Sequence, residues 1–132
     1  MHAVDLAGVR AELQRVAALA LDAAGLIDAS RVGLYPPDQV AAPAVWIEQP
    51  TVRPTPGSAG VAIAAVEWSI VVAVDGADRA QIALLDLVVW ELWNTLIPLG
   101  ALTIARPQPL DVGGPNLRGV VLSLTVPTAT RC

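Results

Sequence analysis

Any chemistry in this chain would have to come from carboxylates, because the other reactive side chains are nearly absent. The sequence holds 12 Asp and Glu residues but a single His and a single Cys. His2 and Cys132 stand near the two ends, where chains fray. Without a usable His or Cys, the Ser-His-Asp and Cys-His catalytic arrangements and the common zinc sites lack their residues. We therefore expect no cofactor and no metal.

The carboxylates closest together in sequence are Asp75, Asp78 and Asp86, a set that could be imagined as a metal or acid–base site. Their positions favour structural roles instead. Asp75 lies in a turn, Asp78 would cap a helix, and Asp86 is a polar position on that helix. Glu67 is the one charge within residues 61–74, and we expect it to face solvent, with pairing to an Arg across an interface as the alternative. The sequence predicts no enzyme.

Composition indicates a protein with more apolar surface than one copy can bury. Hydrophobic residues make up 55% of the 132 residues and charged residues only 15%, below the usual quarter. Some apolar surface should therefore be covered by a partner. The net charge is −4, and the eight basic residues, all Arg, are scattered along the chain. Nucleic-acid binding needs a basic footprint, so we expect no direct binding of nucleic acid.

The first third of the chain predicts one helix followed by irregular, proline-rich segments. Asp5 can cap a helix from Leu6 to about Ala24 that stops at Gly25. Its apolar stripe consists of Leu6, Val9, Leu13, Val16 and Ala20. Arg10 falls off this stripe, on the predicted polar side. Residues 31–35 could form a short strand, and residues 44–50 form a second one.

The middle of the chain predicts a long hairpin. Residues 51–60, "TVRPTPGSAG", are expected to be the Pro/Gly-rich loop at its tip. In the following run, "VAIAAVEWSIVVAV" (61–74), the apolar alternation changes parity near Ala64–Ala65, which predicts a bulge or bend there. Residues 65–74 would then belong to the core, while 61–64 continue into an arm that protrudes from the domain.

A second helix is expected from Arg79 to Leu96, where Asp78 and Gln81 resemble a capping box. Its predicted core stripe is Ile82, Leu85, Val89, Leu92, Trp93 and Leu96. A surplus of apolar residues lies on the other side, namely Leu84, Leu87, Val88 and Trp90. A helix that is apolar on more than one face is covered on more than one face.

No membrane association is expected. The most apolar run, 82–97, is interrupted by Asp86, Glu91 and Asn94, which argues against a membrane span. The first residues carry charges and do not read as a signal peptide. These features predict a soluble, intracellular protein.

Strands near 102–106 and 117–126 complete a single domain over residues 1–132. The predicted order is α-(β)-β-β-α-β-β. Connections of hairpin length favour an α+β fold, with a mainly antiparallel sheet of four to five strands, two helices packed on one face and a protruding hairpin.

This succession resembles the tail terminator, or tail completion and neck, proteins of long-tailed, siphovirus-type bacteriophages. The resemblance is carried by "GLYPP" (33–37), "PAVWIEQP" (43–50), "VEWSIVVAV" (66–74) and the helix "ADRAQIALLDLVVWELWNTL" (77–96). It implies a subunit of a hexameric ring that caps the completed tail tube, stops its polymerisation and offers a docking face to the head connector. It also implies a place in the virion, at the head-proximal end of the tail, after assembly in the host cytoplasm.

The family resemblance carries no catalytic motif, so the contact surfaces are inferred from the apolar residues themselves. In a head-to-tail ring each subunit uses two different patches. We expect the hairpin and the outer side of the second helix to supply them. The candidate interface residues are Arg53, Val61, Ile63, Leu84, Leu87 and Trp90. The partners would be other copies of the chain, the tail tube protein and the head–tail connector.

Three other readings remain open at this stage. The protein could be a different neck or connector subunit. It could be a cellular adaptor that forms a heterodimer through its apolar second helix. The third alternative, a small enzyme that uses carboxylates alone, lacks a plausible cluster.

Overall fold

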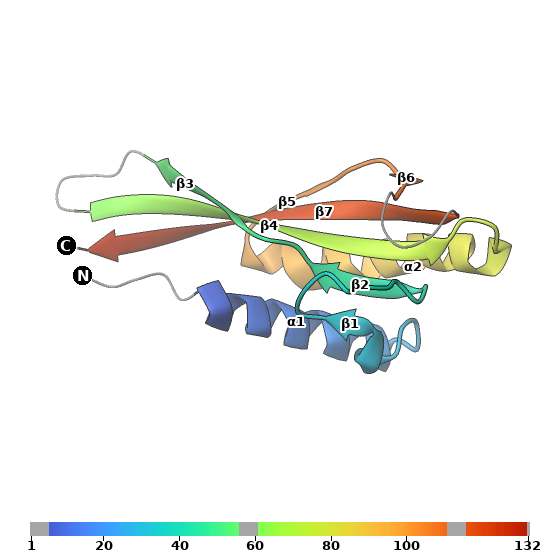
Figure 1. The fold of residues 1–132 in the computed structure, drawn as a ribbon. Helices are drawn as coiled ribbons and strands as arrows, with labels where there is room; N and C mark the ends of the chain where they lie inside the picture. Colours follow the sequence, from blue (N-terminus) through green and yellow to red (C-terminus); the bar gives the residue numbers. More distant parts are fainter. Residues whose placement is uncertain (1–5, 56–60, 111–115, 132) are drawn as a thin grey trace.

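The computed structural model describes residues 6–55, 61–110 and 116–131. Two helices lie on one face of a single seven-stranded sheet (Figure 1). The helices are α1 (Leu6–Ala23) and α2 (Arg79–Leu96), with short 3₁₀ turns at Ala29–Arg31 and Ile97–Leu99. The strands are β1 (Val32–Gly33), β2 (Ala44–Ile47), β3 (Thr51–Thr55), β4 (Val61–Asp75), β5 (Ala101–Ile104), β6 (Gln108–Pro109) and β7 (Leu117–Arg131). This is the α+β arrangement expected from the sequence.

The sheet has seven strands, more than the expected four to five. The two strands that were not predicted are β3 and β6. Its main path is β1-β2-β4-β7-β5, with β3 added to β4 and β6 added to β7. β1 and β2 are parallel, and every other pair is antiparallel. The prediction that residues 51–60 are all loop was wrong for 51–55, which pair with β4. The prediction took Pro54 as a sign of a loop. An edge strand nevertheless tolerates proline where its missing N–H would face outward.

The ladder between β4 and β7 is the longest feature of the molecule. It runs without a change of register from Val61 opposite Arg131 to Asp75 opposite Leu117. The bulge predicted near Ala64–Ala65 is therefore absent. The change in apolar parity has another cause: the free end of the β4–β7 hairpin extends past both helices (Figure 1), so the helix-facing pattern of the core need not continue there.

The core forms between the helices and one face of the sheet. Alternate residues of β4 and β7 supply the sheet side, namely Val66, Trp68, Ile70, Val72, Val74, Val120, Leu122 and Leu124, and all of them are buried. A second, smaller cluster lies on the opposite face, where Trp46 packs with Val71 beneath Val40 and Leu110. The sheet is therefore covered by helices on one side and only partly covered, by loop residues, on the other.

The end of α1 is formed as the sequence predicts, one residue early. Gly25 adopts φ +70°, a conformation that glycine tolerates best. The N–H of Gly25 donates to Asp22 O and that of Leu26 donates to Leu21 O, both at 3.0 Å. These two bonds make a Schellman motif that satisfies the last helical carbonyls. The predicted cap, Asp5, lies outside the described residues.

Helix α2 has the predicted bounds, but its buried face differs from the predicted stripe. The carboxylate of Asp78 caps it, accepting from the N–H groups of Ala80 at 2.9 Å and Gln81 at 3.4 Å. The buried residues are Leu85, Val88, Leu92 and Leu96. Val88, expected to point outward, is 0% exposed, whereas Ile82, expected in the core, is 37% exposed. A helix that is apolar around most of its circumference does not reveal from sequence which face the sheet covers.

By length and composition alone, residues 79–99 could also cross a membrane. A core helix of a globular domain passes the same test. Here α2 packs its Leu85–Leu96 face against the sheet, and 22% of the apolar stretch is buried.

Arg10 on α1 is buried, with 5% of its surface exposed, contrary to its predicted place on the polar side. Its guanidinium donates to three backbone carbonyls, those of Leu34 (2.6 Å), Ile47 (2.8 Å) and Glu48 (3.1 Å). It also lies over two rings, 4.5 Å from the centroid of Tyr35 and 5.4 Å from that of Trp68. One side chain thus joins α1 to the segment after β1, to the end of β2 and to β4.

Replacing Arg10 by Met should lower the free energy of unfolding by about 3 kcal/mol, because buried carbonyls lose their charged donor. Arg15→Met is the matched control on the same helix. Arg15 pairs with Glu12 on the exposed side of the helix, so its loss should leave stability nearly unchanged. Urea unfolding followed by circular dichroism measures both variants. Equal stability of the two would show that the Arg10 contacts do not hold α1 to the sheet.

Candidate subunit interface

The outer side of α2 carries the largest exposed aromatic side chain of the described residues. Trp90 is 64% exposed, and Leu87, one helical turn earlier on the same side, is 56% exposed. Ile104, on β5 beside the helix, is 39% exposed. We call these three residues the α2 patch. A cluster of exposed large apolar residues on one side of a small domain marks a surface that another molecule covers.

A groove of about 280 Å³ runs beside the α2 patch. Its walls come from α2, from β5 and the segment after it, and from β7. The residues are Asp86, Val89, Trp90, Trp93, Ile104, Ala105, Pro107 and Val120. Asp86 is the one ionisable side chain among them. Aromatic side chains are enriched where proteins meet, because they bury a large area and lose little conformational freedom.

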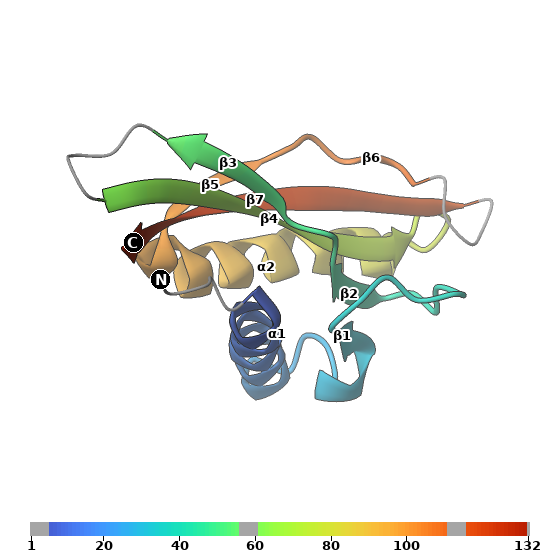
Figure 2. The same cartoon turned by 60° about the vertical axis from the view of Figure 1, so that its left-hand side comes forward.

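The second candidate surface is the end of the hairpin, which we call the arm and define as residues 51–55, 61–65 and 126–131. The β4 strand has 15 residues and α2 has 18. At about 3.3 Å per strand residue and 1.5 Å per helical residue, β4 is longer than α2 by about 20 Å. Figure 2 shows the same end of the sheet reaching past both helices.

The predicted interface residues fall on these two surfaces to different degrees. Leu87 and Trp90 are exposed on the α2 patch, while Leu84 is half-buried and packs against the core. Arg53 lies in β3, and Val61 and Ile63 lie in the arm portion of β4. The side chains of these last three are outside the described part of the structure.

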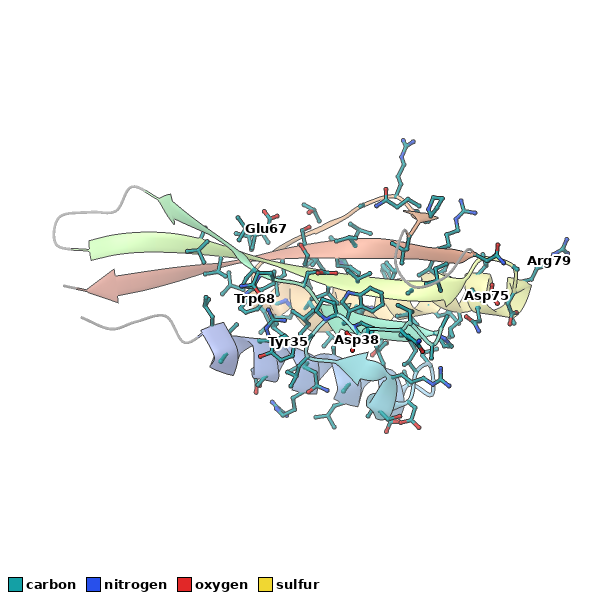
Figure 3. The ribbon with its side chains drawn as sticks, in the orientation of Figure 1. Tyr35, Asp38, Glu67, Trp68, Asp75 and Arg79 are labelled. Carbon is teal, nitrogen blue, oxygen red and sulfur yellow. The ribbon has the colours of Figure 1, made fainter. Side chains whose placement is uncertain are left out.

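The carboxylates do not converge on a site. Among the described residues, no group of three His, Cys, Asp or Glu side chains could hold a metal ion. Asp75 accepts from the N–H of Ala77 at 2.9 Å in the turn after β4, and Asp78 is occupied at the helix start. Glu67 is half-buried on the sheet face that points away from the helices, whereas its neighbour Trp68 points toward them (Figure 3).

The clear shifts in carboxylate pKa have local causes. A hydrogen bond from Arg15 lowers the pKa of Glu12 on α1. A hydrogen bond from the backbone N–H of Ser30 lowers the pKa of Asp28. Both carboxylates are exposed and hold local helix or turn structure, so neither pKa indicates a reactive group.

Only part of the groove beside the α2 patch could be found from the sequence. Trp90 could be found, because it stood out on the surplus apolar side of the predicted helix. Ile104 and Pro107 carried no such signal. They line the same groove as Trp90 only because β5 pairs with β7 beside α2, a tertiary arrangement that no local pattern encodes.

The sequence matches no protein-family model and no curated protein. A solved structure does match, a chain of the structure titled "Virion of native gene transfer agent (GTA) particle". The alignment has 20% sequence identity and a TM-score of 0.57, and it covers 89% of this chain and 95% of the other. At this identity the likeness is one of fold: the α+β domain described here has nearly the same extent as a chain found in a virion.

Proposed function

We propose that this protein is a structural subunit of a phage-type virion and forms a ring that terminates the tail tube. The observation that carries the proposal is the pair of separate contact surfaces, the α2 patch and the arm, on one small domain. The fold shared with a chain of a gene transfer agent virion supports it. In this role the ring, expected to be a hexamer, stops tube polymerisation and presents a docking face to the head connector.

Two unlike surfaces suit a ring better than a two-fold dimer. An isologous dimer uses the same patch on both subunits, whereas a head-to-tail ring joins two different patches of each subunit. The α2 patch is compact and apolar, and the arm is an extended piece of sheet. Each subunit would therefore present different parts of these surfaces to its two neighbours.

The nearest alternative is another head–tail neck or connector subunit, since the fold likeness is to a virion chain without reference to its position. An adaptor that forms a heterodimer through α2 would use the α2 patch but would leave the arm without a role. We therefore rank the adaptor lower.

The first prediction of this proposal concerns solution mass. Purified protein should reach a mass near six subunits as its concentration rises, and negative-stain images should show closed rings. Static light scattering across a concentration series measures this. A monodisperse monomer at all concentrations would contradict a ring that the chain forms unaided.

The second prediction concerns Trp90. Trp90→Glu should leave the domain folded but shift assembly to at least tenfold higher concentration, because the buried contact would then hold an unpaired charge. Leu19→Glu is a suitable control, since Leu19 is similarly exposed, at 58%, but lies on α1. Sedimentation velocity compares the variants, with circular dichroism as the check on folding. If Trp90→Glu assembles like the parent, the α2 patch is not a subunit contact.

A further inference from the structure

The arm has two open backbone edges. Within the described residues, β3 pairs only with β4, and β7 beyond Thr125 also pairs only with β4. One edge is therefore the outer side of β3, and the other is the outer side of β7 from Val126 to Arg131. Consecutive residues of an antiparallel ladder direct their N–H and C=O groups to opposite sides. The groups that face outward on each edge can thus be identified.

On β7 the residues whose backbone N–H and C=O groups face outward are odd-numbered. Ala105 N–H donates to Val121 O at 3.0 Å, so odd positions of β7 face the β5 side. By the same alternation, the backbone groups of Pro127, Ala129 and Arg131 face outward in the arm, beyond the part of β7 that pairs with β5. Because proline has no N–H, this edge offers three carbonyls but N–H groups only at Ala129 and Arg131.

On β3 the residues whose backbone N–H and C=O groups face outward are even-numbered. Glu48 N–H donates to Ser69 O at 2.9 Å, so odd positions of β4 face the side of β2 and β3. Thr51 lies opposite Glu67, so the odd residues of β3 bind β4. Val52 and Pro54 therefore face outward, and Val52 supplies the one outward N–H of this strand. The β3 edge thus offers two carbonyls and one N–H group, and the β7 edge offers three carbonyls and two N–H groups.

We propose that the outer edge of β7 in one copy pairs, in parallel, with the outer edge of β3 in the next copy of the ring. This inference rests on the proposed ring function and names the contact made by the arm. β3 and β7 both run antiparallel to β4, so they are parallel to each other. Rotation about a ring axis that runs along the strands preserves their direction, so the two edges that meet are parallel as well.

One register of this parallel pair requires no N–H group from either proline. In it Pro54 and Pro127 only accept hydrogen bonds. In a parallel ladder, a residue donates to one partner residue and accepts from the partner two positions further on. With Val52 placed between Pro127 and Ala129 of the neighbour, Val52 N–H donates to Pro127 O and Ala129 N–H donates to Val52 O. The N–H of the neighbour's Arg131 then donates to Pro54 O. Two β3 edges facing each other would share only the two N–H groups of their Val52 residues.

A pair of cysteines tests this register. In a Cys132→Ser background, Val52→Cys and Thr128→Cys would lie side by side across the contact, about 5 Å apart at Cα, which is within disulfide reach. Within one copy β4 separates these strands by about 10 Å, so any bond must join two copies. Oxidation should give a ladder of covalent oligomers up to the closed ring. In the control pair Val52→Cys and Ala129→Cys, the two positions are not opposite each other in this register, so the pair should not link.

The backbone donor can be tested separately. Ala129→Pro removes the outward N–H without touching the ladder to β4, whereas Ala129→Val keeps it. We expect Ala129→Pro to raise the concentration needed for assembly about tenfold, with Ala129→Val close to the parent. Circular dichroism should show both variants folded.

The outcomes separate this inference from the proposed function. Assembly seen by light scattering without the 52–128 cross-link would overturn the strand pairing and leave the ring in place. Covalent dimers formed by Ala129→Cys alone would show that β7 pairs with itself about a two-fold axis, which also overturns it. A monomer with no cross-link at any concentration would contradict both the pairing and the unaided ring.

Discussion

The buried guanidinium of Arg10 is the interaction on which the packing of α1 depends. A charged side chain is rarely buried unless its charge is satisfied. Here three backbone carbonyls and the faces of two aromatic rings provide that environment. The carbonyls come from the chain after β1 and from the end of β2, where the backbone leaves the sheet. Arg10 therefore satisfies polar groups that no strand partner reaches, and it fixes α1 over the middle of β4.

Because Arg10 holds α1 in place, one end of the sheet can extend beyond the two helices. With α1 and α2 fixed over the region from Val66 to Val74, the helical layer protects the centre of the β4–β7 ladder. The rest of the ladder continues as the arm. A two-stranded ribbon is marginal on its own in water. The addition of β3, and the continuous register with the buried half, support the arm as an extension of the folded domain.

The distribution of apolar residues links this fold to assembly. The buried face of α2 fills the core, yet Leu87 and Trp90 remain on its outer side and Ile104 lies beside them. Exposure of such residues lowers solubility in a monomer and is removed when a partner covers them. The arm differs from the α2 patch, because its open strand edges can pair with strands of other molecules. Pro54 and Pro127 each remove one outward N–H from those edges, which limits the ways in which they can pair.

The sequence by itself determined both helices, most of the strands and the class of the fold. The limits of α2 followed from Asp78 and the apolar periodicity, and the end of α1 followed from Gly25. The scarcity of His and Cys, with one of each, left few residues for catalysis. These signals are local, so they could be seen without a structure. Trp90 could be identified for the same reason, as an aromatic residue on the surplus side of a helix.

Only the tertiary structure decided how those elements meet. Arg10 looked like a polar surface residue because nothing near it in sequence shows that distant carbonyls and rings surround it. Val88 and Ile82 exchanged their expected places because the sheet, rather than the helix, selects which apolar face is buried. The strand at Thr51–Thr55 depended on the pairing edge that β4 offers, which outweighed the local signal of Pro54. In each case a long-range contact prevailed over local preference, since burial and backbone pairing contribute more free energy than the propensity of single residues.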